Sequence, residues 1–110
     1  MHVFLEHSSV ERTDRKGSRQ KQVNYTSFYI SETNKPILVS RQLGEYEKLL
    51  PDTEFTRIHD KYIINLSYIR EYIKGSGGDV VLENGKELPV ASRRKEDFLS
   101  RFEKWIKRKT

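Results

Sequence analysis

The chain has 110 residues, which suits one small domain and is too short for two independent hydrophobic cores. Its 21 Lys and Arg residues outnumber 16 Asp and Glu residues, and the formal charge of +5 favours a polyanionic partner without choosing between DNA, RNA and an anionic membrane. The absence of cysteine excludes disulfides and thiolate zinc sites, and no apolar run approaches the roughly 18 residues that span a bilayer.

The first 22 residues contain few apolar side chains after a short apolar start. Residues 1–5 have the composition of a short strand, whereas residues 6–22 are dense in Arg, Lys, Ser and Asp. A stretch with so little apolar surface predicts a mobile or loop-like segment. We therefore expect a poorly structured or partly stranded segment at residues 1–22 and a folded domain at residues 23–110.

Aromatic and β-branched residues concentrate at residues 23–30 and predict a strand. A polar turn before Pro36 leads to a second strand at residues 37–39, which predicts a hairpin. A short helix follows, with Ser40 as a candidate N-cap and Pro51 at its end. Its apolar face is formed by Leu43, Tyr46, Leu49 and Leu50.

Residues 55–58 and 62–66 are predicted strands on either side of an exposed, basic bend. Residues 69–90 are then predicted to form a three-stranded meander. The Gly-rich segment 75–78 suits a turn between strands, because it lacks the Gly-Lys-Ser/Thr ending of a phosphate-binding loop. The Asn84-Gly85 pair predicts a type I′ hairpin turn.

The last predicted element is an amphipathic helix near the C-terminus. Its apolar stripe consists of Phe98, Leu99, Phe102, Trp105 and Ile106. Trp105 at this spacing is more typical of a core residue than of a stacking platform for single-stranded nucleic acid. The stripe is also needed to close a small domain, which argues against a role at a membrane surface.

Residues suited to catalysis are scarce. The acidic pairs Glu45/Glu47 and Glu96/Asp97 are not spaced to converge, and no Ser-His-Asp order accompanies a nucleophile turn. The three histidines, His2, His7 and His59, lack metal-ligand spacing. We therefore expect no enzymatic activity, no cofactor and no metal site. The chain also begins without the pattern of a signal peptide, so we expect a cytoplasmic protein.

A cluster of basic residues, Ser92-Arg93-Arg94-Lys95, lies between the last predicted strand and the last predicted helix. One interpretation is a solvated helix start with Ser92 as its N-cap. The other is a DNA contact, because arginine binds guanine in a bidentate manner and lysine binds phosphate. Three cations at a helix start oppose the helix dipole, and a polyanion would relieve that conflict.

Two segments resemble a known family. Residues 55–65, FTRIHDKYIIN, resemble the LytTR signature F-x-R-x-H-(R/K)-S-(Y/F)-(I/V)-(I/V)-N, and residues 84–94, NGKELPVASRR, resemble its n-G-x-x-(I/L)-P-V-S-R element. The resemblance covers about residues 24–102. It implies a mostly β, elongated, antiparallel β-sheet sandwich with a short helix between strands and a C-terminal amphipathic helix. In that family loops, rather than a recognition helix, enter the DNA grooves.

The resemblance implies three DNA-facing elements: the Asn24/Tyr25 region, the bend 59–61 and the loop 93–95. Arg94 would contact a base in the major groove, and the bend would contact the backbone or the minor groove. Tyr25 suits packing on the sheet equally well, and His59, mostly uncharged at neutral pH, would make a pH-dependent hydrogen bond. The complete predicted DNA-binding set is Asn24, Tyr25, Arg57, His59, Asp60, Lys61, Arg93, Arg94 and Lys95.

Two positions depart from the family pattern. Asp60 stands where the family has Arg, Lys or Asn, and we expect its carboxylate to weaken DNA binding, alter the site preference, or pair with Lys61 or Arg57. Residues 18–22 replace an apolar strand, which predicts a missing edge strand and a sheet edge open to a second chain.

The sequence therefore predicts a sequence-specific regulator of transcription that binds double-stranded DNA, of the response-regulator output type, pairing as a homodimer on repeated sites. No receiver domain is found in the chain, so it is either a fragment of a longer regulator, with a receiver domain and a sensor histidine kinase as partners, or a free-standing domain. The alternative is a degenerate LytTR-like module that binds protein or itself through the open sheet edge and has only non-specific affinity for DNA.

Overall fold

A computed structural model describes residues 2–13, 20–33, 35–75 and 77–109 of the chain. The elements in chain order are β1 (Val3–Thr13), β2 (Gln20–Ile30), β3 (Ile37–Val39), α1 (Leu43–Leu49), β4 (Phe55–His59), β5 (Tyr62–Asn65), η1 (Leu66–Tyr68), β6 (Ile69–Ile73), β7 (Asp79–Leu82), β8 (Glu87–Pro89), η2 (Ser92–Arg94) and α2 (Lys95–Lys109), where η is a 3₁₀ helix. The molecule is elongated, measuring 58 × 30 × 25 Å. The predicted fold class is confirmed.

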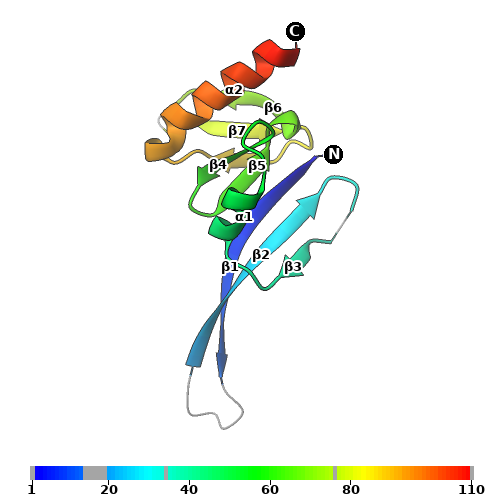
Figure 1. Ribbon diagram of the computed structural model, residues 1–110, viewed down its shortest axis with the longest axis vertical. Helices are drawn as coiled ribbons and strands as arrows, with labels where there is room; N and C mark the ends of the chain where they lie inside the picture. Colours follow the sequence, from blue (N-terminus) through cyan, green and yellow to red (C-terminus); the bar gives the residue numbers. More distant parts are fainter. Residues whose placement is uncertain (1, 14–19, 34, 76, 110) are drawn as a thin grey trace.

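The strands form two antiparallel sheets (Figure 1). One has five strands in the order β3-β2-β1-β5-β4, and the other has three strands in the order β6-β7-β8. The β1–β2 hairpin projects from one end of the molecule, and α2 lies at the other end. The strand pairings confirm three predicted features: the hairpin of the strands at residues 23–30 and 37–39, the strand pair around the bend, and the three-stranded meander.

The N-terminal region differs from the prediction. Residues 6–13 are not loop-like, because they belong to β1 and pair in continuous register with β2, from Val3 opposite Ile30 to Thr13 opposite Gln20. No edge strand is missing at residues 20–22, since they belong to β2. Polar residues form these strands because the ladder satisfies their backbone groups and apolar residues at its inner end anchor the register. Residues 14–19 lie outside the described residues.

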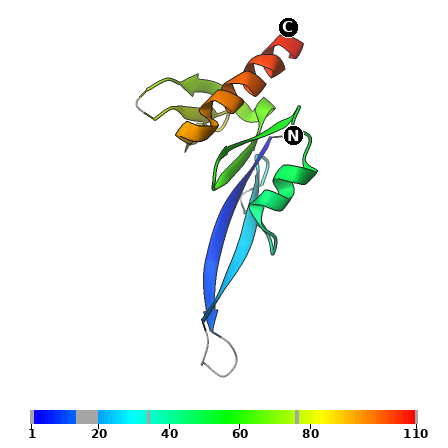
Figure 2. The same cartoon turned by 60° about the vertical axis from the view of Figure 1, so that its left-hand side comes forward.

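Strand alternation divides the core between the two sides of the first sheet. Phe4 and Ile64 point toward the second sheet and α2, where they pack in one cluster with Val80, Leu88 and Phe98. On the opposite side, Val3, Leu5 and Ile63 pack in a second cluster against Leu43 of α1. Figure 2 shows α1 beside the β1–β2 hairpin. The burial of Leu43 thus fixes α1 against the sheet near the base of the hairpin.

Local geometry corrects three predicted details. Ser40 does not cap α1, which begins after Gln42 without a side-chain cap bond, and Ser92 is the first residue of η2 rather than a cap. The turn at Asn84-Gly85 is not type I′, because only Gly85 has a positive φ, of 90°. Asn84 instead accepts a hydrogen bond from the Lys86 N–H through its side chain.

The C-terminal helix is present, but its buried stripe is narrower than predicted. Phe98 is fully buried, and Phe102 and Trp105 pack against the same core, which confirms the core assignment of Trp105. Leu99 and Ile106 are 37% and 43% exposed. Among the described residues, no helix is long and apolar enough to cross a membrane.

Candidate nucleic-acid interface

The bend between β4 and β5 is held by hydrogen bonds within it. The pairing register shifts between Arg57 and His59. The backbone N–H of Lys61 donates to His59 Nδ1 over 3.1 Å. Arg57 donates from Nε to the His59 carbonyl over 3.2 Å and from Nη2 to the Asp60 carbonyl over 2.7 Å. These bonds fix the backbone of the bend before any ligand arrives.

Arg57 also connects the bend to α1. Its Nη1 donates to Glu47 Oε1 over 2.8 Å, and its side chain is only 16% exposed. Each of its three guanidinium nitrogens is therefore engaged within the protein. Arg57, predicted from the resemblance as a DNA contact, has the contacts of a residue that positions the bend.

The 3₁₀ helix η2 brings two further arginines to the bend. The Ala91 N–H donates to the Ile58 carbonyl over 2.8 Å, which places η2 beside β4. Arg93 is 68% exposed and pairs with the carboxylate of Asp60. Arg94 lies between two acidic residues, 3.7 Å from Glu47 and 3.6 Å from Asp60. The predicted loop 93–95 and the predicted bend thus form one surface through Arg93 and Arg94.

The guanidinium of Arg94 is not satisfied by these neighbours. Distances of 3.6 and 3.7 Å exceed the length of a hydrogen bond. Its Nε is buried and has no hydrogen-bond partner in the part of the chain that the structure describes. Arg94, which is 24% exposed, therefore differs from the fully engaged Arg57 and keeps donors for another acceptor.

Asp60 pairs differently from the expectation. Among the described residues its carboxylate contacts Arg93 and approaches Arg94, whereas the predicted partners were Lys61 and Arg57. The hydrogen bond from Arg93 lowers the pKa of the Asp60 carboxyl below its ordinary value, and the charges of Arg93, Arg94 and Arg57 add to this effect. Asp60 is therefore a carboxylate at neutral pH, in direct contact with the predicted DNA-binding arginine loop.

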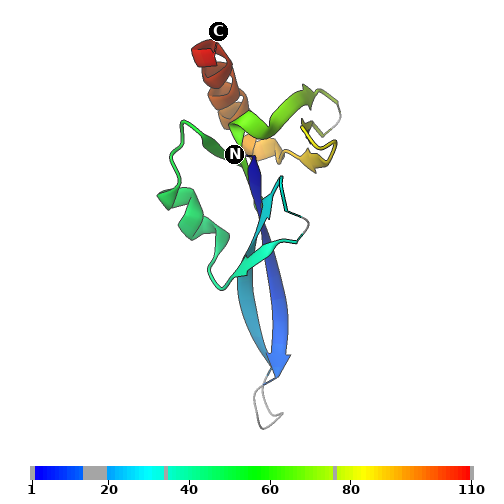
Figure 3. The ribbon, with the colours of Figure 1, turned by 90° about the vertical axis from the view of Figure 1, so that its right-hand side faces the viewer.

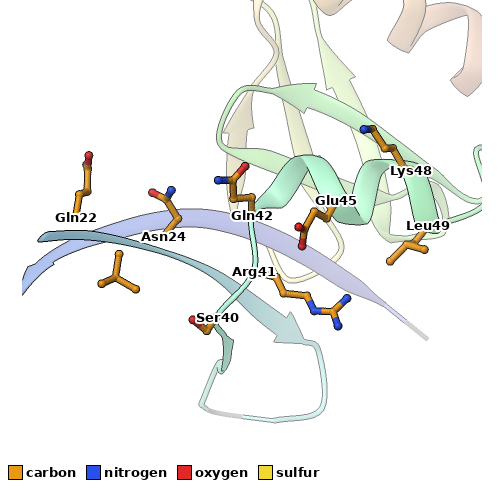
Figure 4. Close-up of a pocket in the computed structure, with 9 residues that line it drawn as sticks. Gln22, Asn24, Ser40, Arg41, Gln42, Glu45, Lys48 and Leu49 are labelled. Atoms are coloured by element: carbon orange, nitrogen blue, oxygen red, sulfur yellow. The ribbon is translucent and has the colours of Figure 1, made fainter.

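Asn24 reaches the same surface from β2. A hollow of about 560 Å³ is lined by His7, Gln22, Asn24, Gln42, Leu43, Gly44, Arg57 and Asp60. A second hollow, of about 810 Å³, lies between β2 and α1, with Gln22 and Asn24 on β2 and Glu45, Lys48 and Leu49 on α1 (Figure 4). Both hollows are lined by the carboxamides of Gln22, Asn24 and Gln42.

Two predicted residues, Tyr25 and Lys95, are directed away from this surface. Tyr25 is half-buried and, as the neighbour of Asn24 along a strand, faces the opposite side of β2. The side chain of Lys95 lies over Gly78, in the hairpin turn between β6 and β7. Sequence reasoning in turn missed Gln22, Gln42 and Glu47. Gln22 fell in the segment predicted to be loop-like, and polar helix residues such as Glu47 carry no local signal of a contact across the fold.

Comparisons with known proteins agree with this architecture. The family model of the LytTr DNA-binding domain matches residues 19–103. The chain is 32% identical over 77 residues to the sensory transduction protein LytT of Bacillus subtilis, covering 68% of this chain and 30% of LytT. It is 37% identical over 71 residues to the transcriptional regulatory protein LytR of Staphylococcus aureus, covering 63% of this chain and 29% of LytR.

A solved structure supports the fold. The chain matches a LytTr DNA-binding domain from Bacillus cereus with a TM-score of 0.67 and 22% identity, covering 91% of this chain and 79% of that chain. The chain therefore shares its fold with this domain, while it spans about 30% of the length of LytT and LytR.

Proposed function

The chain belongs to the LytTr DNA-binding domain family, and we propose that it recognises specific sequences in double-stranded DNA as the output domain of a transcription regulator. The observation that supports this most directly is the convergence of Arg94, the bend and Asn24 on one surface. Arg94 retains donors there, because its Nη1 lies 3.7 Å from Glu47 and its Nη2 lies 3.6 Å from Asp60, beyond hydrogen-bond distance. An arginine with free donors beside a rigid loop suits the bidentate recognition of guanine.

Each element has a separate role in this proposal. Arg94 contacts a base edge in a major groove, and the exposed Arg93 contacts phosphate. The bend approaches the DNA backbone or the minor groove beside that major groove. His59 offers its Nε2–H as a donor there, because its Nδ1 accepts a hydrogen bond from the Lys61 N–H. Asn24, on the neighbouring hollow, contacts the next groove segment. Arg57 holds the bend in place rather than touching DNA.

The assembly and its regulation are also part of the proposal. LytT and LytR are named as sensory transduction and transcriptional regulatory proteins, and this chain spans less than a third of each. We infer that the chain acts in the cytoplasm as the DNA-binding part of a longer regulator, with a receiver domain under a sensor histidine kinase. Homodimers on repeated sites would place two such reading surfaces on one face of the duplex.

Selection from a randomised duplex library at two salt concentrations tests the proposal. Phosphate contacts give affinity that falls steeply with salt, whereas base contacts enrich one motif. We expect one enriched motif, present as a repeat if the chain pairs on DNA. Uniform binding that disappears at the higher salt concentration would contradict sequence recognition. It would support the alternative of a degenerate interaction module. That alternative was suggested by an edge strand predicted to be missing at residues 18–22, whereas residues 20–22 pair with β1 as part of β2.

Replacing Asp60 with Asn is expected to tighten binding to the selected duplex about 1.5- to 5-fold. The carboxylate competes with DNA for Arg93 and Arg94, and the ion pair with Arg93 is exposed, so its loss has a modest effect. Because its pKa is lowered, Asp60 stays charged between pH 5 and 8, so a change in DNA affinity of the unmodified chain over this pH range does not arise from Asp60.

Asp52→Asn is the control for this substitution. Asp52 is also exposed and lies 3.6 Å from an arginine, but that partner is Arg101 of α2. Removing its charge changes the net charge equally and is expected to leave the dissociation constant within about twofold. An equal gain from both variants would show that net charge, not the contact with the arginine loop, limits binding.

A further inference from the structure

The β1–β2 hairpin continues beyond the sheet to which it belongs. β1 pairs with β5 only through residues 4–6, and β2 pairs with β3 only through residues 26–28. One more hydrogen bond, from the His7 N–H to the Lys61 carbonyl, joins β1 to the bend. Beyond it, residues 8–13 and 20–25 pair with each other and form a two-stranded ribbon (Figure 3).

The ribbon has the dimensions of a groove-binding element. Six residue pairs at about 3.3 Å per residue extend roughly 20 Å, the length of about six base pairs. Two-stranded ribbons fit the major groove of B-DNA, which is about 12 Å wide. A ribbon without a core beneath it is marginally stable in water, and Val10 at 48% exposure shows how little apolar surface this one buries.

The base of the ribbon belongs to the candidate interface. Gln22 and Asn24 of β2 line the hollow that also contains Arg57 and Asp60, and His7 of β1 lines it as well. Gln22 is oriented across the ribbon by a hydrogen bond from its Nε2 to Ser9 Oγ over 3.1 Å. A duplex seated on the bend and the arginine loop would therefore meet polar, hydrogen-bonding side chains as it passes onto the ribbon.

The sequence of this segment favours a polyanion. Residues 11–21 include five cations, Arg12, Arg15, Lys16, Arg19 and Lys21, and two anions, Glu11 and Asp14. Arg12 and Lys21 are opposite each other in the β1–β2 register. This segment therefore contributes more than half of the formal charge of +5.

We propose that the β1–β2 ribbon is an additional DNA-contacting element, which lies along a major groove and lengthens the recognised site by about six base pairs on one side. The inference rests on the proposed DNA-binding function. In it, the ribbon contacts the duplex segment that flanks the motif. In this proposal Arg12 and Lys21, at opposite positions of the ribbon, contact phosphate, and the carboxamides of Gln22 and Asn24 contact bases.

The variant R12Q/K21Q tests the proposal by removing two charges from opposite positions of the ribbon. We expect binding to the selected duplex to weaken roughly tenfold at 0.15 M salt, and the slope of log K against log salt to fall by about 1 to 2. The matched control is R70Q/K74Q, which removes two charges from exposed positions at and after β6 of the other sheet. Circular dichroism checks that both variants are folded.

A second measurement uses the unmodified chain. Duplexes are shortened base pair by base pair on either side of the selected motif, and we expect affinity to fall on the ribbon side as the flank drops below about six base pairs. R12Q/K21Q should lose less affinity than the unmodified chain on the same shortening.

Two results would overturn the inference. One is equal affinity and equal salt slope for R12Q/K21Q and R70Q/K74Q, and the other is a cost of flank shortening that is the same for R12Q/K21Q and the unmodified chain. Failure of the underlying function is distinguishable, because the unmodified chain would then select no motif at all. If the unmodified chain selects a motif but R12Q/K21Q behaves as in either of the two results above, only the role of the ribbon is refuted.

Discussion

Replacing Arg94 with Ala is expected to cost roughly 1–3 kcal/mol of DNA-binding free energy and to relax the base preference at one position of the motif. The guanidinium makes no hydrogen bond to Glu47 or Asp60, so these residues restrain it without using its donors. The substitution therefore removes a ligand contact more than a structural one. Selection from the randomised library, repeated with the variant, measures both quantities.

Two neighbouring substitutions separate shape from charge. Arg94→Lys keeps the charge but loses the planar pair of donors, and we expect it to lose the same base preference with less loss of affinity. Arg93→Ala removes the exposed partner of Asp60, and we expect it to weaken binding to all sequences and to lower the salt slope by about 1. Thermal unfolding of each variant shows whether stability has changed.

If the effects of Arg94→Ala and Arg93→Ala on base preference were reversed, the base contact would be assigned to Arg93. If Arg94→Ala keeps the full preference and Arg93→Ala relaxes it, Arg93 reads the base and Arg94 only braces the bend. If neither changes the preference, recognition lies elsewhere, and Asn24 with the adjoining carboxamides would be the next residues to replace.

Local patterns in the sequence were sufficient for most of the fold. The alternating and β-branched residues around the bend predicted β4 and β5, and helical spacing predicted α2 with Phe98 and Trp105 in the core. These elements were predictable because each buries a periodic apolar face. The ribbon was not, because its outer residues are polar and its strands are held by the register of the β1–β2 pair rather than by burial.

The candidate site was only partly predictable for a different reason. The family resemblance brought Arg94, the bend and Asn24 into one hypothesis, but it gave no information on their contacts. Asp60 pairs with an arginine 33 positions away, and Glu47 reaches Arg57 from another element. Such pairs depend on how α1 and η2 pack against β4, which no local pattern encodes.

The second large expected effect is on stability, and it concerns the packing of α2 beside the site. Phe98→Ala is expected to destabilise the domain by roughly 3–5 kcal/mol, because a fully buried aromatic ring is lost from the core. The Phe98 ring stacks on Phe102 at a centroid distance of 5.6 Å and lies against Tyr72 of β6 at the same distance. The loss would be a large share of the 5–15 kcal/mol that is typical of a folded domain.

The control lies one residue further along the same helix. Leu99 is 37% exposed, and Leu99→Ala is expected to cost about 1 kcal/mol or less. Urea titration of both variants and the unmodified chain measures the two losses in the free energy of unfolding. Equal costs at both positions would contradict the orientation of α2. Because η2 runs directly into α2, the backbone that presents Arg94 is lost when α2 unfolds. DNA binding by Phe98→Ala should therefore fall with the folded fraction, while the motif selected by the molecules that remain folded stays the same.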